Sequence, residues 1–279
     1  MSAIRQASLP GYDLGDYIRE SIDFLRQHEP PEGYFVGFSG GKDSITTLQL
    51  CRIAGVKHQA FYSCTRIDPP EVVRFIRREY PKVTWLFPKI TMWEGIMKNA
   101  PPLCNSRWCC DHLKKFPSKN HPLTYRVMGI RAEESAGRAE RGRIHERVLR
   151  KGRGREKRGR KVHTHLHPIF SWPEWAVWEF IEAYRLPYPT MYDEGFSRIG
   201  CVVCPYILGI SPAKQHNREI SKQRWPGLWK SFEHAVKRYW TESSSTGLRD
   251  HATPNETADD YWQAYLNGFE NKEHQLCQK

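Results

Sequence analysis

The sequence has no apolar run long enough to cross a membrane. A spanning helix needs about 20 mostly apolar residues, and no stretch approaching that length occurs. Residues 1–11 also lack the basic and then apolar pattern of a secretory signal. We therefore expect a cytoplasmic protein without membrane contact. In a reducing compartment, its eight cysteines are expected to be metal ligands or catalytic thiols rather than disulfides.

Several motifs of other enzyme classes are missing as well. There is no HExxH metal motif, no Ser-His-Asp hydrolase pattern and no internal repeat. The one Gly-rich loop before a helix is not a Walker A loop, because Asp43 follows Lys42 where Ser or Thr is required. These absences argue against metalloproteases, serine hydrolases, repeat proteins and P-loop NTPases.

Negative charge is scarce in one segment. The chain carries a formal charge of +12, and residues 138–161 hold twelve Lys and Arg against three Glu. Such an Arg- and Gly-rich block favours a mobile loop that contacts a polyanion. The alternative is a solvated basic loop without a partner. We expect a nucleic acid, with DNA preferred, to bind through residues 138–161.

The most informative stretch runs from Ser39 to Ser44. It follows an apolar run at residues 34–38 and leads into a helical pattern at 45–50. Two glycines allow backbone N–H groups to approach an anion, and the helix N-terminus favours negative charge. The pattern predicts a phosphate site, although an ordinary turn with a serine cap is the alternative. The expected ligands are Ser39, Gly40, Gly41, Lys42, Asp43 and Ser44.

Alternating helical and strand patterns predict an α/β fold. A helix is expected over residues 12–27, and the other expected helices and strands alternate as in a parallel sheet with helices on both faces. Ligands of such sheets lie at the carboxyl ends of the strands. The expected strands are 34–38, 57–62, 83–87, 125–130 and 165–170, and the expected helices include 70–80 and 173–184.

The chain beyond residue 205 reads as helical. We expect one domain over residues 1–210 and a helical extension over 211–279, whose polar residues after 243 form a poorly packed tail. The aromatic residues around the helix at 173–184 are at helical spacing and are expected in the core rather than in base stacking. They are Trp172, Trp175, Trp178 and Phe180.

The cysteines fall into two pairs. Cys109 and Cys110 are adjacent, and Cys201 and Cys204 form a CxxC pair about ninety positions later. Four thiolates suit tetrahedral zinc or a [4Fe–4S] cluster, and buried small side chains are the bland alternative. Cys51, on the helix after the phosphate loop, is expected to be merely buried.

These segments together resemble a known family. The 39–44 loop resembles the SGGxDS loop of the PP-loop ATP pyrophosphatases. The segments 109–117 and 199–205 resemble the two cysteine segments of cluster-bearing adenylyl-sulfate reductases. Residues 129–138 resemble the GxRxxxSxxR motif, and 168–178 the PIxxWxxxxVW segment, of the adenylyl-sulfate and phosphoadenylyl-sulfate reductases. The resemblance covers roughly residues 30–210.

The resemblance implies an adenine nucleotide alpha hydrolase-like fold and a set of site residues. ATP would bind over the loop with Mg²⁺ bridging its phosphates, and Asp43 would orient the loop, hold the metal or cap the helix. Arg131 and Arg138 would clamp phosphate, and Glu134 and Ser135 belong to the same nucleotide motif. A [4Fe–4S] cluster, with zinc as the alternative, would be held by Cys109, Cys110, Cys201 and Cys204.

Two departures separate the chain from the reductases of that family. Their catalytic cysteine lies in an ECGxH-like tail, whereas Cys277 lacks the neighbouring Gly and His. Their acidic-Thr-Gly segment is also absent. Glu134–Ser135, and the proline after Cys204, instead resemble the DNA phosphorothioation branch. In that branch an ATP pyrophosphatase works with a cysteine desulfurase, and other modification subunits are possible partners.

The expected function is therefore adenylation of a nucleic-acid phosphate for sulfur incorporation. A phosphate oxygen would attack the α-phosphorus of ATP, and sulfur would then displace the adenylate. Cys104 would relay sulfur, serve as an alternative ligand, or be a plain loop residue. The alternatives are an adenylyl-sulfate or phosphoadenylyl-sulfate reductase with Cys277 as nucleophile, a tRNA-thiolating enzyme, and a non-catalytic nucleic-acid-binding module.

Overall fold

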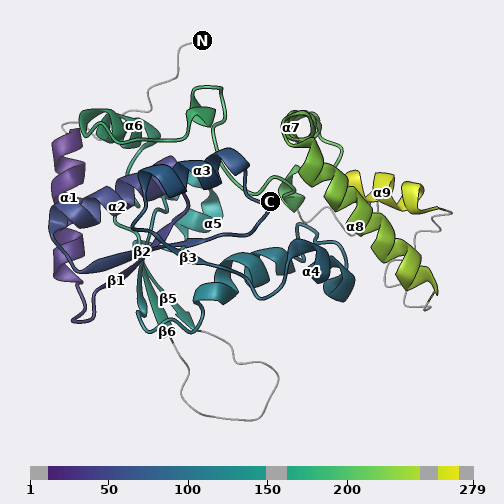
Figure 1. Ribbon diagram of the computed structural model, residues 1–279. Coiled ribbons are helices and arrows are strands. Elements are labelled where there is room, and N and C mark those ends of the chain that lie inside the picture. Colours follow the sequence, from purple (N-terminus) through teal and green to yellow (C-terminus); the bar gives the residue numbers. More distant parts are fainter. Residues whose placement is uncertain (1–11, 149–161, 246–256, 270–279) are drawn as a thin grey trace. The chain divides into compact units, whose positions relative to one another are not determined.

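A computed structural model describes residues 12–148, 162–245 and 257–269. In these residues the strands form one six-stranded sheet in the order β3-β2-β1-β4-β6-β5 (Figure 1). Neighbouring strands are parallel except β5, which is antiparallel to β6. The strands are β1 (Tyr34–Phe38), β2 (His58–Ser63), β3 (Thr84–Leu86), β4 (Tyr125–Met128), β5 (Ile144–Val148) and β6 (Val162–Leu166). The predicted mostly parallel α/β fold is confirmed.

The central strand explains why the phosphate loop has a fixed position. β1 pairs with β2 on one side and with β4 on the other. A strand that is covered on both faces and both edges needs apolar side chains nearly throughout, and four of the five residues of β1 are buried. The loop at residues 39–41 therefore starts from the most constrained strand of the sheet.

Helices pack against this sheet and against one another. α1 (Leu14–Gln27) begins with a capping box in which Asp13 and Asp16 each accept a backbone N–H of the other. It contacts α2 (Lys42–Ala54) and α6 (Glu174–Ala183), which also contact each other. The remaining helices of the described chain are α3 (Pro70–Glu79), α4 (Met92–Asn99), α5 (Ala136–Ala139), α7 (Pro212–Arg224), α8 (Pro226–Ser245) and α9 (Ala258–Leu266).

The chain folds as two compact units made from interleaved segments. The first, here called the sheet unit, comprises Met1–Ser63, Glu71–Leu86 and Lys119–Ile199. The second, the cysteine unit, comprises Cys64–Pro70, Phe87–Ser118 and Gly200–Lys279. The chain passes between the two units several times, and the expected domain division at residue 210 stays a prediction.

The end of the chain corrects one expectation. We expected a poorly packed tail after residue 243, but α9 lies in that region and begins with a capping box at Thr257. Its Tyr261, Trp262 and Tyr265 are buried, and the ring of Phe232 on α8 lies 6.0 Å from that of Trp262. A helix this short has too few apolar positions to stand out in a polar sequence.

The basic block is also more ordered than expected in its first half. Residues 136–139 form α5, and 144–148 form β5, so the expectation of a loop over 138–161 is wrong there, while residues 149–161 lie outside the described structure. Strand pairing with β6 overrides the charged composition. The strand expected at 165–170 starts three residues earlier and ends four residues earlier, at Val162–Leu166. In the described residues, no helix is long and apolar enough to span a membrane.

Candidate active site

The loop between β1 and α2 is a tight turn that only glycine fits at residue 40. Gly40 has a φ of +74°, and a Cβ there would lie 2.9 Å from side-chain carbons of Ile76. A left-handed backbone conformation and the lack of space both exclude larger residues. The predicted strand, Gly-rich turn and helix start are therefore present in the order expected of an anion site.

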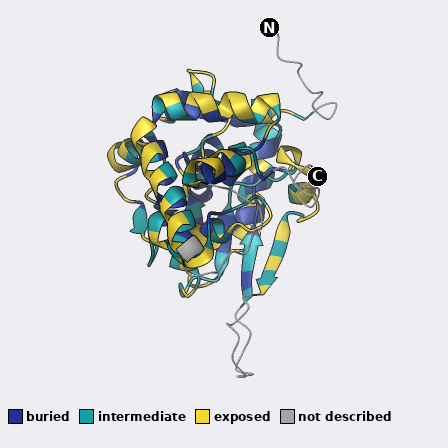
Figure 2. Ribbon diagram, turned by 90° about the vertical axis from the view of Figure 1, so that its right-hand side faces the viewer, coloured by how far each residue is buried: buried dark blue, intermediate teal, exposed yellow. Residues whose placement is uncertain are grey.

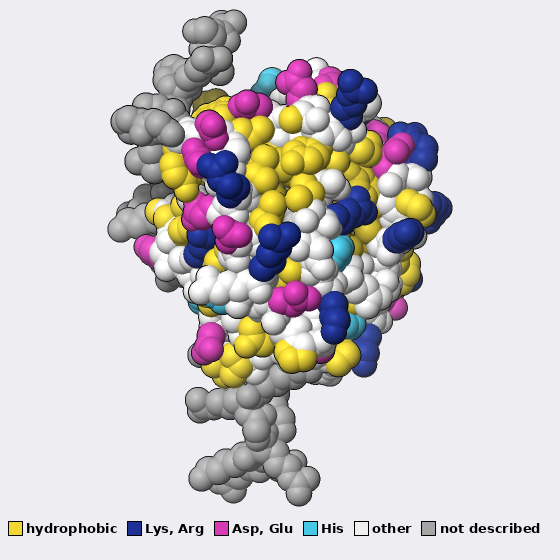
Figure 3. All heavy atoms as spheres, turned by 90° about the vertical axis from the view of Figure 1, so that its left-hand side faces the viewer, with side chains coloured by type: hydrophobic (Ala, Val, Ile, Leu, Met, Phe, Trp, Pro, Cys, Tyr) yellow, Lys and Arg dark blue, Asp and Glu magenta, His cyan; other side chains and the backbone are white. Residues whose placement is uncertain are grey.

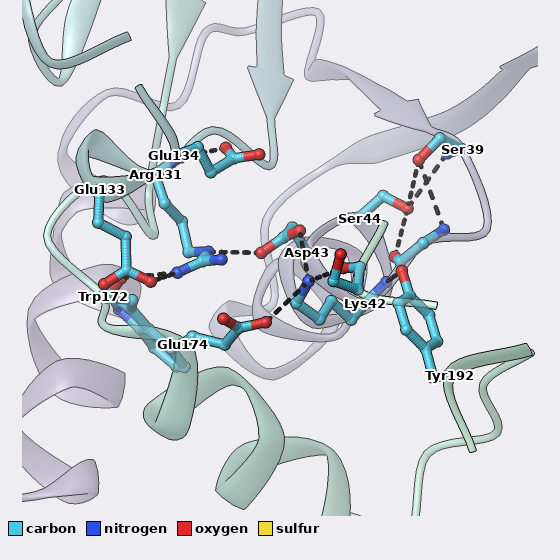
Figure 4. Close-up of polar contacts among 12 residues, drawn as sticks. Ser39, Lys42, Asp43, Ser44, Arg131, Glu133, Glu134, Trp172, Glu174 and Tyr192 are labelled. Carbon is cyan, nitrogen blue, oxygen red and sulfur yellow. Dashed lines mark hydrogen bonds and ion pairs between the residues drawn. The ribbon is translucent and has the colours of Figure 1, made fainter. Parts of the chain in front are cut away.

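Two serines brace this turn (Figure 4). The Ser44 hydroxyl accepts the backbone N–H of Ser39 at 3.1 Å and donates to the carbonyl of Gly41 at 2.8 Å. The Ser39 hydroxyl lies 3.2 Å from that of Ser44. The two serines close the loop on itself, which gives the first and last residues of the motif a local structural role.

The end of β4 approaches the loop so closely that Gly129 must lack a side chain. A Cβ at Gly129 would lie 2.6 Å from the carbonyl oxygen of Asp43. This contact joins the start of the predicted 129–138 motif to the first turn of α2. Two motifs that are far apart in the sequence therefore meet in one place.

Asp43 and Arg131 form the central ion pair of the site. The Nε of Arg131 donates to Oδ1 of Asp43 at 2.6 Å, and the Arg131 side chain is only 4% exposed. Arg131 also pairs with Glu133 and donates to the carbonyl of Trp172 at 3.5 Å. Burial lowers the pKa of Arg131, but the carboxylates of Asp43 and Glu133 outweigh it and raise the pKa overall. Arg131 thus remains charged beside the loop.

The side chain of Lys42 contacts residues that were not predicted from the sequence. Its ammonium lies 3.2 Å from a carboxylate oxygen of Glu174 and donates to the carbonyl of Ser197 at 3.1 Å. It also lies over the rings of Trp178 and Tyr192. The backbone N–H of Lys42 donates to the Tyr192 hydroxyl at 3.0 Å (Figure 4), and burial raises the pKa of that hydroxyl to about 12. The Tyr192 hydroxyl is therefore the hydrogen-bond acceptor of one backbone N–H group at the start of α2.

An open pocket of about 370 Å³ adjoins Lys42 in the sheet unit. Trp178 lines it, which corrects the expectation that this residue belongs to the core, whereas Trp172 and Phe180 are buried as expected. Nothing in the local sequence signals that residues about 150 positions after the loop would reach Lys42. The lining residues are Glu174, Trp178, Tyr188, Tyr192, Asp193, Gly195, Phe196 and Ser197.

The other predicted site residues of the 129–138 motif contact Arg131 or one another rather than the loop. Glu134 accepts the backbone N–H of Arg131 at 3.1 Å and pairs with the guanidinium of Arg138. Ser135 precedes α5, and its carbonyl accepts the N–H of Arg138 at 2.9 Å. The structure therefore joins Lys42, Asp43 and Arg131 directly, while Arg138 contacts Glu134 and a role of Arg138 at phosphate stays a prediction.

The four paired cysteines all belong to the cysteine unit. Cys109 is buried, and Cys110 begins a π-helical turn, η1 (Cys110–Lys115). A hydrogen bond between the two thiols raises the pKa of Cys109 and lowers that of Cys110, and Cys201 and Cys204 raise the pKa of Cys109 further. Cys109 therefore lies within electrostatic range of the other three paired cysteines.

Cys201 lies among polar groups. Its sulfur is 3.8 Å from the Thr65 hydroxyl and 4.0 Å from Oδ1 of Asp68. Burial raises the pKa of the Cys201 thiol, and the Lys114 ammonium opposes that rise. The next residue, Val202, donates its N–H to the carbonyl of Ile67 at 2.9 Å, which fixes the CxxC segment against the turn after β2.

Cys104 lies near the second cysteine pair. Its thiol donates to the carbonyl of Pro205 at 3.1 Å, directly after Cys204. Cys104, Cys109 and Cys204 all raise the pKa of the buried Tyr265, after burial itself. A fifth thiol therefore lies close to the paired cysteines. Cys51 is buried on α2 as expected, and burial raises its pKa to about 12.

The paired cysteines were predicted to hold a [4Fe–4S] cluster or zinc. In the described residues, no three His, Cys, Asp or Glu side chains are arranged to hold one metal ion. A zinc ion needs its four ligands around one point, whereas the thiolates of a [4Fe–4S] cluster stand further apart around a larger cage. The four paired cysteines supply the right kind and number of donors for either group, and a cluster held by them stays a prediction.

Comparison with known proteins places the chain in a family. The phosphoadenosine phosphosulfate reductase domain matches residues 33–207, which include the loop, the 129–138 motif and all four paired cysteines. The chain therefore belongs to the phosphoadenosine phosphosulfate reductase domain family. The resemblance noted from the sequence is confirmed at this level.

Individual relatives are more distant. An uncharacterized protein of Methanocaldococcus jannaschii is 28% identical over 240 residues, which cover 81% of this chain and 46% of the relative. An adenosine 5'-phosphosulfate reductase of Shouchella clausii is 23% identical over 224 residues, 76% of this chain and 86% of that protein. The chain spans about half the length of the first curated relatives it matches.

The solved structures that resemble the chain also share little sequence identity with it. The phosphoadenylyl-sulfate reductase from Candida auris, in a phosphate complex, is 17% identical with a TM-score of 0.46. The match covers 70% of this chain and 97% of that chain.

Proposed function

We propose that the chain binds an adenine nucleotide over residues 39–44 and breaks the anhydride linkage at its α-phosphate. The observation that carries this proposal is the joining of the glycine turn, Lys42 and Arg131 at the start of one helix. Backbone N–H groups, a helix N-terminus and a guanidinium are the donors that phosphate oxygens prefer. The family match over residues 33–207 supports it.

The residues of the site would divide the work. The loop would hold phosphate oxygens, and Arg131 would stabilise the charge that develops on the departing phosphate or sulfonate group. Lys42 would add its charge after leaving Glu174, since an incoming polyanion competes with that carboxylate. The pocket beside Lys42 has room for the group attached to the phosphate.

Asp43 does not fit the metal role in the present arrangement. Its carboxylate accepts from Arg131 at 2.6 Å and lies 4.0 Å from the Lys42 ammonium, so two basic groups already face it. A Mg²⁺ ion would have to replace Arg131 there. We therefore assign Asp43 to positioning Arg131 and assign no step to Mg²⁺.

The first candidate reaction is reduction of an adenylyl sulfate. The family match and relatives named adenosine 5'-phosphosulfate reductase favour it. A thiolate would attack the sulfur, the S–O bond to the α-phosphate would break, and the adenylate would leave with that bonding pair, held by Arg131. The sequence offers Cys277 as the nucleophile, which lies outside the described residues.

The second candidate is ATP-driven sulfur transfer to a nucleic-acid phosphate. The SGGxDS pattern of the loop and the basic block at 138–161 favour it. A phosphate oxygen would attack the α-phosphorus, the bond to the β-phosphate would break and pyrophosphate would leave. The outer sulfur of a persulfide donor, such as a cysteine desulfurase, would then attack the phosphorus and displace the adenylate. A second thiol would attack the inner sulfur of the resulting S–S–P linkage, which releases the phosphorothioate and leaves a disulfide.

Either reaction draws on the cysteine unit. Cys109, Cys110, Cys201 and Cys204 are the residues that would hold a [4Fe–4S] cluster, and such a cluster would supply an electropositive or redox-active centre for sulfur chemistry. Cys104 would act beside them as a relay thiol. The polar surroundings of Cys201, with Thr65, Asp68 and Lys114, would offset the charge of the thiolates.

One anaerobic experiment separates the two candidates. Pyrophosphate release from ATP is measured with and without DNA, and sulfite release from adenylyl sulfate is measured with a thiol reductant. Thiol-dependent sulfite that disappears in Cys277→Ala establishes the reductase. Pyrophosphate that DNA increases, and that is unaffected by Cys277→Ala, establishes the second reaction. If neither nucleotide binds, or if Arg131→Ala binds both as well as the natural chain, the proposed function is wrong.

A further inference from the structure

A second group of basic side chains lies on the sheet away from the phosphate loop. Strand register puts Phe35, Arg126, His165 and His145 opposite one another in turn across β1, β4, β6 and β5. Residues that are directly opposite in a sheet share a face. Arg147 and His163, two pairs further along, share it as well. We call Arg126, His145, Arg147, His163 and His165 the basic face.

Contacts confirm that these side chains gather. The Arg126 guanidinium lies 3.4 Å from the His163 ring nitrogen and over the ring of Phe35 at 4.4 Å. The rings of His145 and His165 are 6.3 Å apart. Arg126 and His163 are buried, whereas His145, Arg147 and His165 are half-buried. The basic face thus has an inner part on β4 and β6 and an accessible part toward the edge strand.

The acidic residue of β5 points elsewhere. Side chains of β5 alternate between exposed and half-buried (Figure 2), so Glu146 projects from the side opposite His145 and Arg147. Figure 3 shows one face of the molecule, on which acidic and basic side chains are interspersed around hydrophobic ones. The basic face is therefore a local concentration of one sign of charge.

The electrostatics show mutual repulsion within the basic face. Burial, followed by Arg126 and Arg147, lowers the pKa of His165 to about 3, with smaller contributions from His163 on β6 and from His167, which follows that strand. Burial and Arg147 lower the pKa of Arg126 to about 10. Charged groups that are partly removed from water and surrounded by like charges gain when an anion joins them.

We propose that the basic face binds a backbone phosphate of a nucleic acid. Arginine and histidine N–H groups donate to phosphate oxygens, and such contacts position a nucleic acid without reading its sequence. β5 and β6 are joined by residues 149–161, which contain eight Lys and Arg and one Glu. That charge in the connecting sequence favours a polyanion with many phosphates over a single free phosphate. The inference rests on the nucleic-acid candidate of the proposed function.

Arg147→Ala tests it, with Arg78→Ala on α3 as the matched control, because both arginines are accessible and only Arg147 belongs to the basic face. Binding of a short fluorescent DNA duplex to the full chain is followed by anisotropy over a range of salt concentrations. We expect Arg147→Ala to weaken binding at least about fivefold. It should also lower the slope of log affinity against log salt concentration by the amount that about one phosphate contact contributes, while Arg78→Ala changes neither quantity. Equal effects of the two variants would overturn the proposal.

Two further measurements identify the ligand. Because the pKa of His165 is lowered to about 3, its ring is neutral at pH 7 and would contact phosphate through a ring N–H; His165→Ala is therefore expected to weaken duplex binding, and equal affinity of the two chains contradicts the proposal. If Arg147→Ala weakens binding of inorganic phosphate but not of the duplex, the site belongs to free phosphate and the proposal is wrong.

Nucleotide binding is measured in the same variants. Its loss in Arg131→Ala, together with no change in Arg147→Ala, tests the loop separately from the basic face.

Discussion

The phosphate loop and the paired cysteines are built in opposite ways. The loop lies between a buried strand and a helix, and its serines and glycines act within six consecutive residues. The cysteines come from a π-helical turn and an irregular segment about ninety positions apart, and side chains from a third segment, Thr65 and Asp68, surround one of them. A site made by regular local geometry tolerates little change at its glycines. A site made by the convergence of separate segments depends instead on the group that its side chains hold.

The largest expected effect is at the cysteines. If the four paired cysteines hold the proposed cluster, Cys201→Ser should remove it and destabilise the cysteine unit, because a thiolate-held group contributes binding energy directly to folding. Iron, acid-labile sulfide and zinc are quantified after anaerobic purification, and thermal unfolding is recorded. Cys51→Ala is the control, since that thiol is buried on α2 in the other unit.

The same variant sharpens the comparison between the units. Cys201→Ser should still bind an adenine nucleotide, because the loop contacts described above all lie in the sheet unit. Full metal content in Cys201→Ser, or equal loss in Cys51→Ala, would contradict the assignment of the four paired cysteines.

Arg131→Ala is expected to have the next largest effect. It leaves the Asp43 carboxylate, 19% exposed, without its 2.6 Å partner, and breaking such a pair costs about 3–5 kcal/mol when it is buried. We expect a somewhat smaller loss of stability because Asp43 is partly solvated, and nucleotide affinity should fall by at least about 100-fold. Denaturant unfolding and calorimetric titration measure the two.

Arg131→Lys is the informative companion. It keeps the charge but loses the planar guanidinium that joins Asp43, Glu133 and the Trp172 carbonyl. Stability should recover more than nucleotide affinity does. Unchanged nucleotide affinity in both variants would show that Arg131 only supports the loop.

The sequence was sufficient to predict the loop and a mostly parallel sheet, because local patterns indicate both the loop and the alternation of strands and helices. The run at 34–38 and the glycines at 40 and 41 are recognisable without distant information. Tyr192, Glu174 and Ser197 were not predictable, since tertiary packing alone brings them to Lys42. Trp178 was assigned to the core because helical spacing identifies a packed face but not where a pocket interrupts it. α9 was missed because nine residues carry too weak a periodic signal.

A smaller effect is expected at the meeting point of two motifs. In Gly129→Ala the new Cβ would lie 2.6 Å from the Asp43 carbonyl oxygen, and backbone must shift because that atom cannot rotate away. Overpacking of this kind costs about 1–3 kcal/mol. Gly137→Ala is the matched control, because a Cβ there meets nothing within 4 Å. Equal unfolding free energies for the two variants would show that the β4 end is not fixed against α2.

The smallest effect tests whether Tyr192 competes with the nucleotide. Its hydroxyl accepts the Lys42 backbone N–H at 3.0 Å, a donor that a phosphate oxygen would otherwise use. Tyr192→Phe keeps the ring beneath the Lys42 ammonium and removes only the acceptor, so adenine nucleotides should bind about 3- to 10-fold more tightly, the worth of one hydrogen bond. Tyr12→Phe, which removes a hydroxyl bonded to Glu20 outside that pocket, should leave affinity unchanged. Weaker binding in Tyr192→Phe would instead make the hydroxyl a direct ligand of the nucleotide, and the loop would then resemble the cysteine centre in depending on a distant residue for its function.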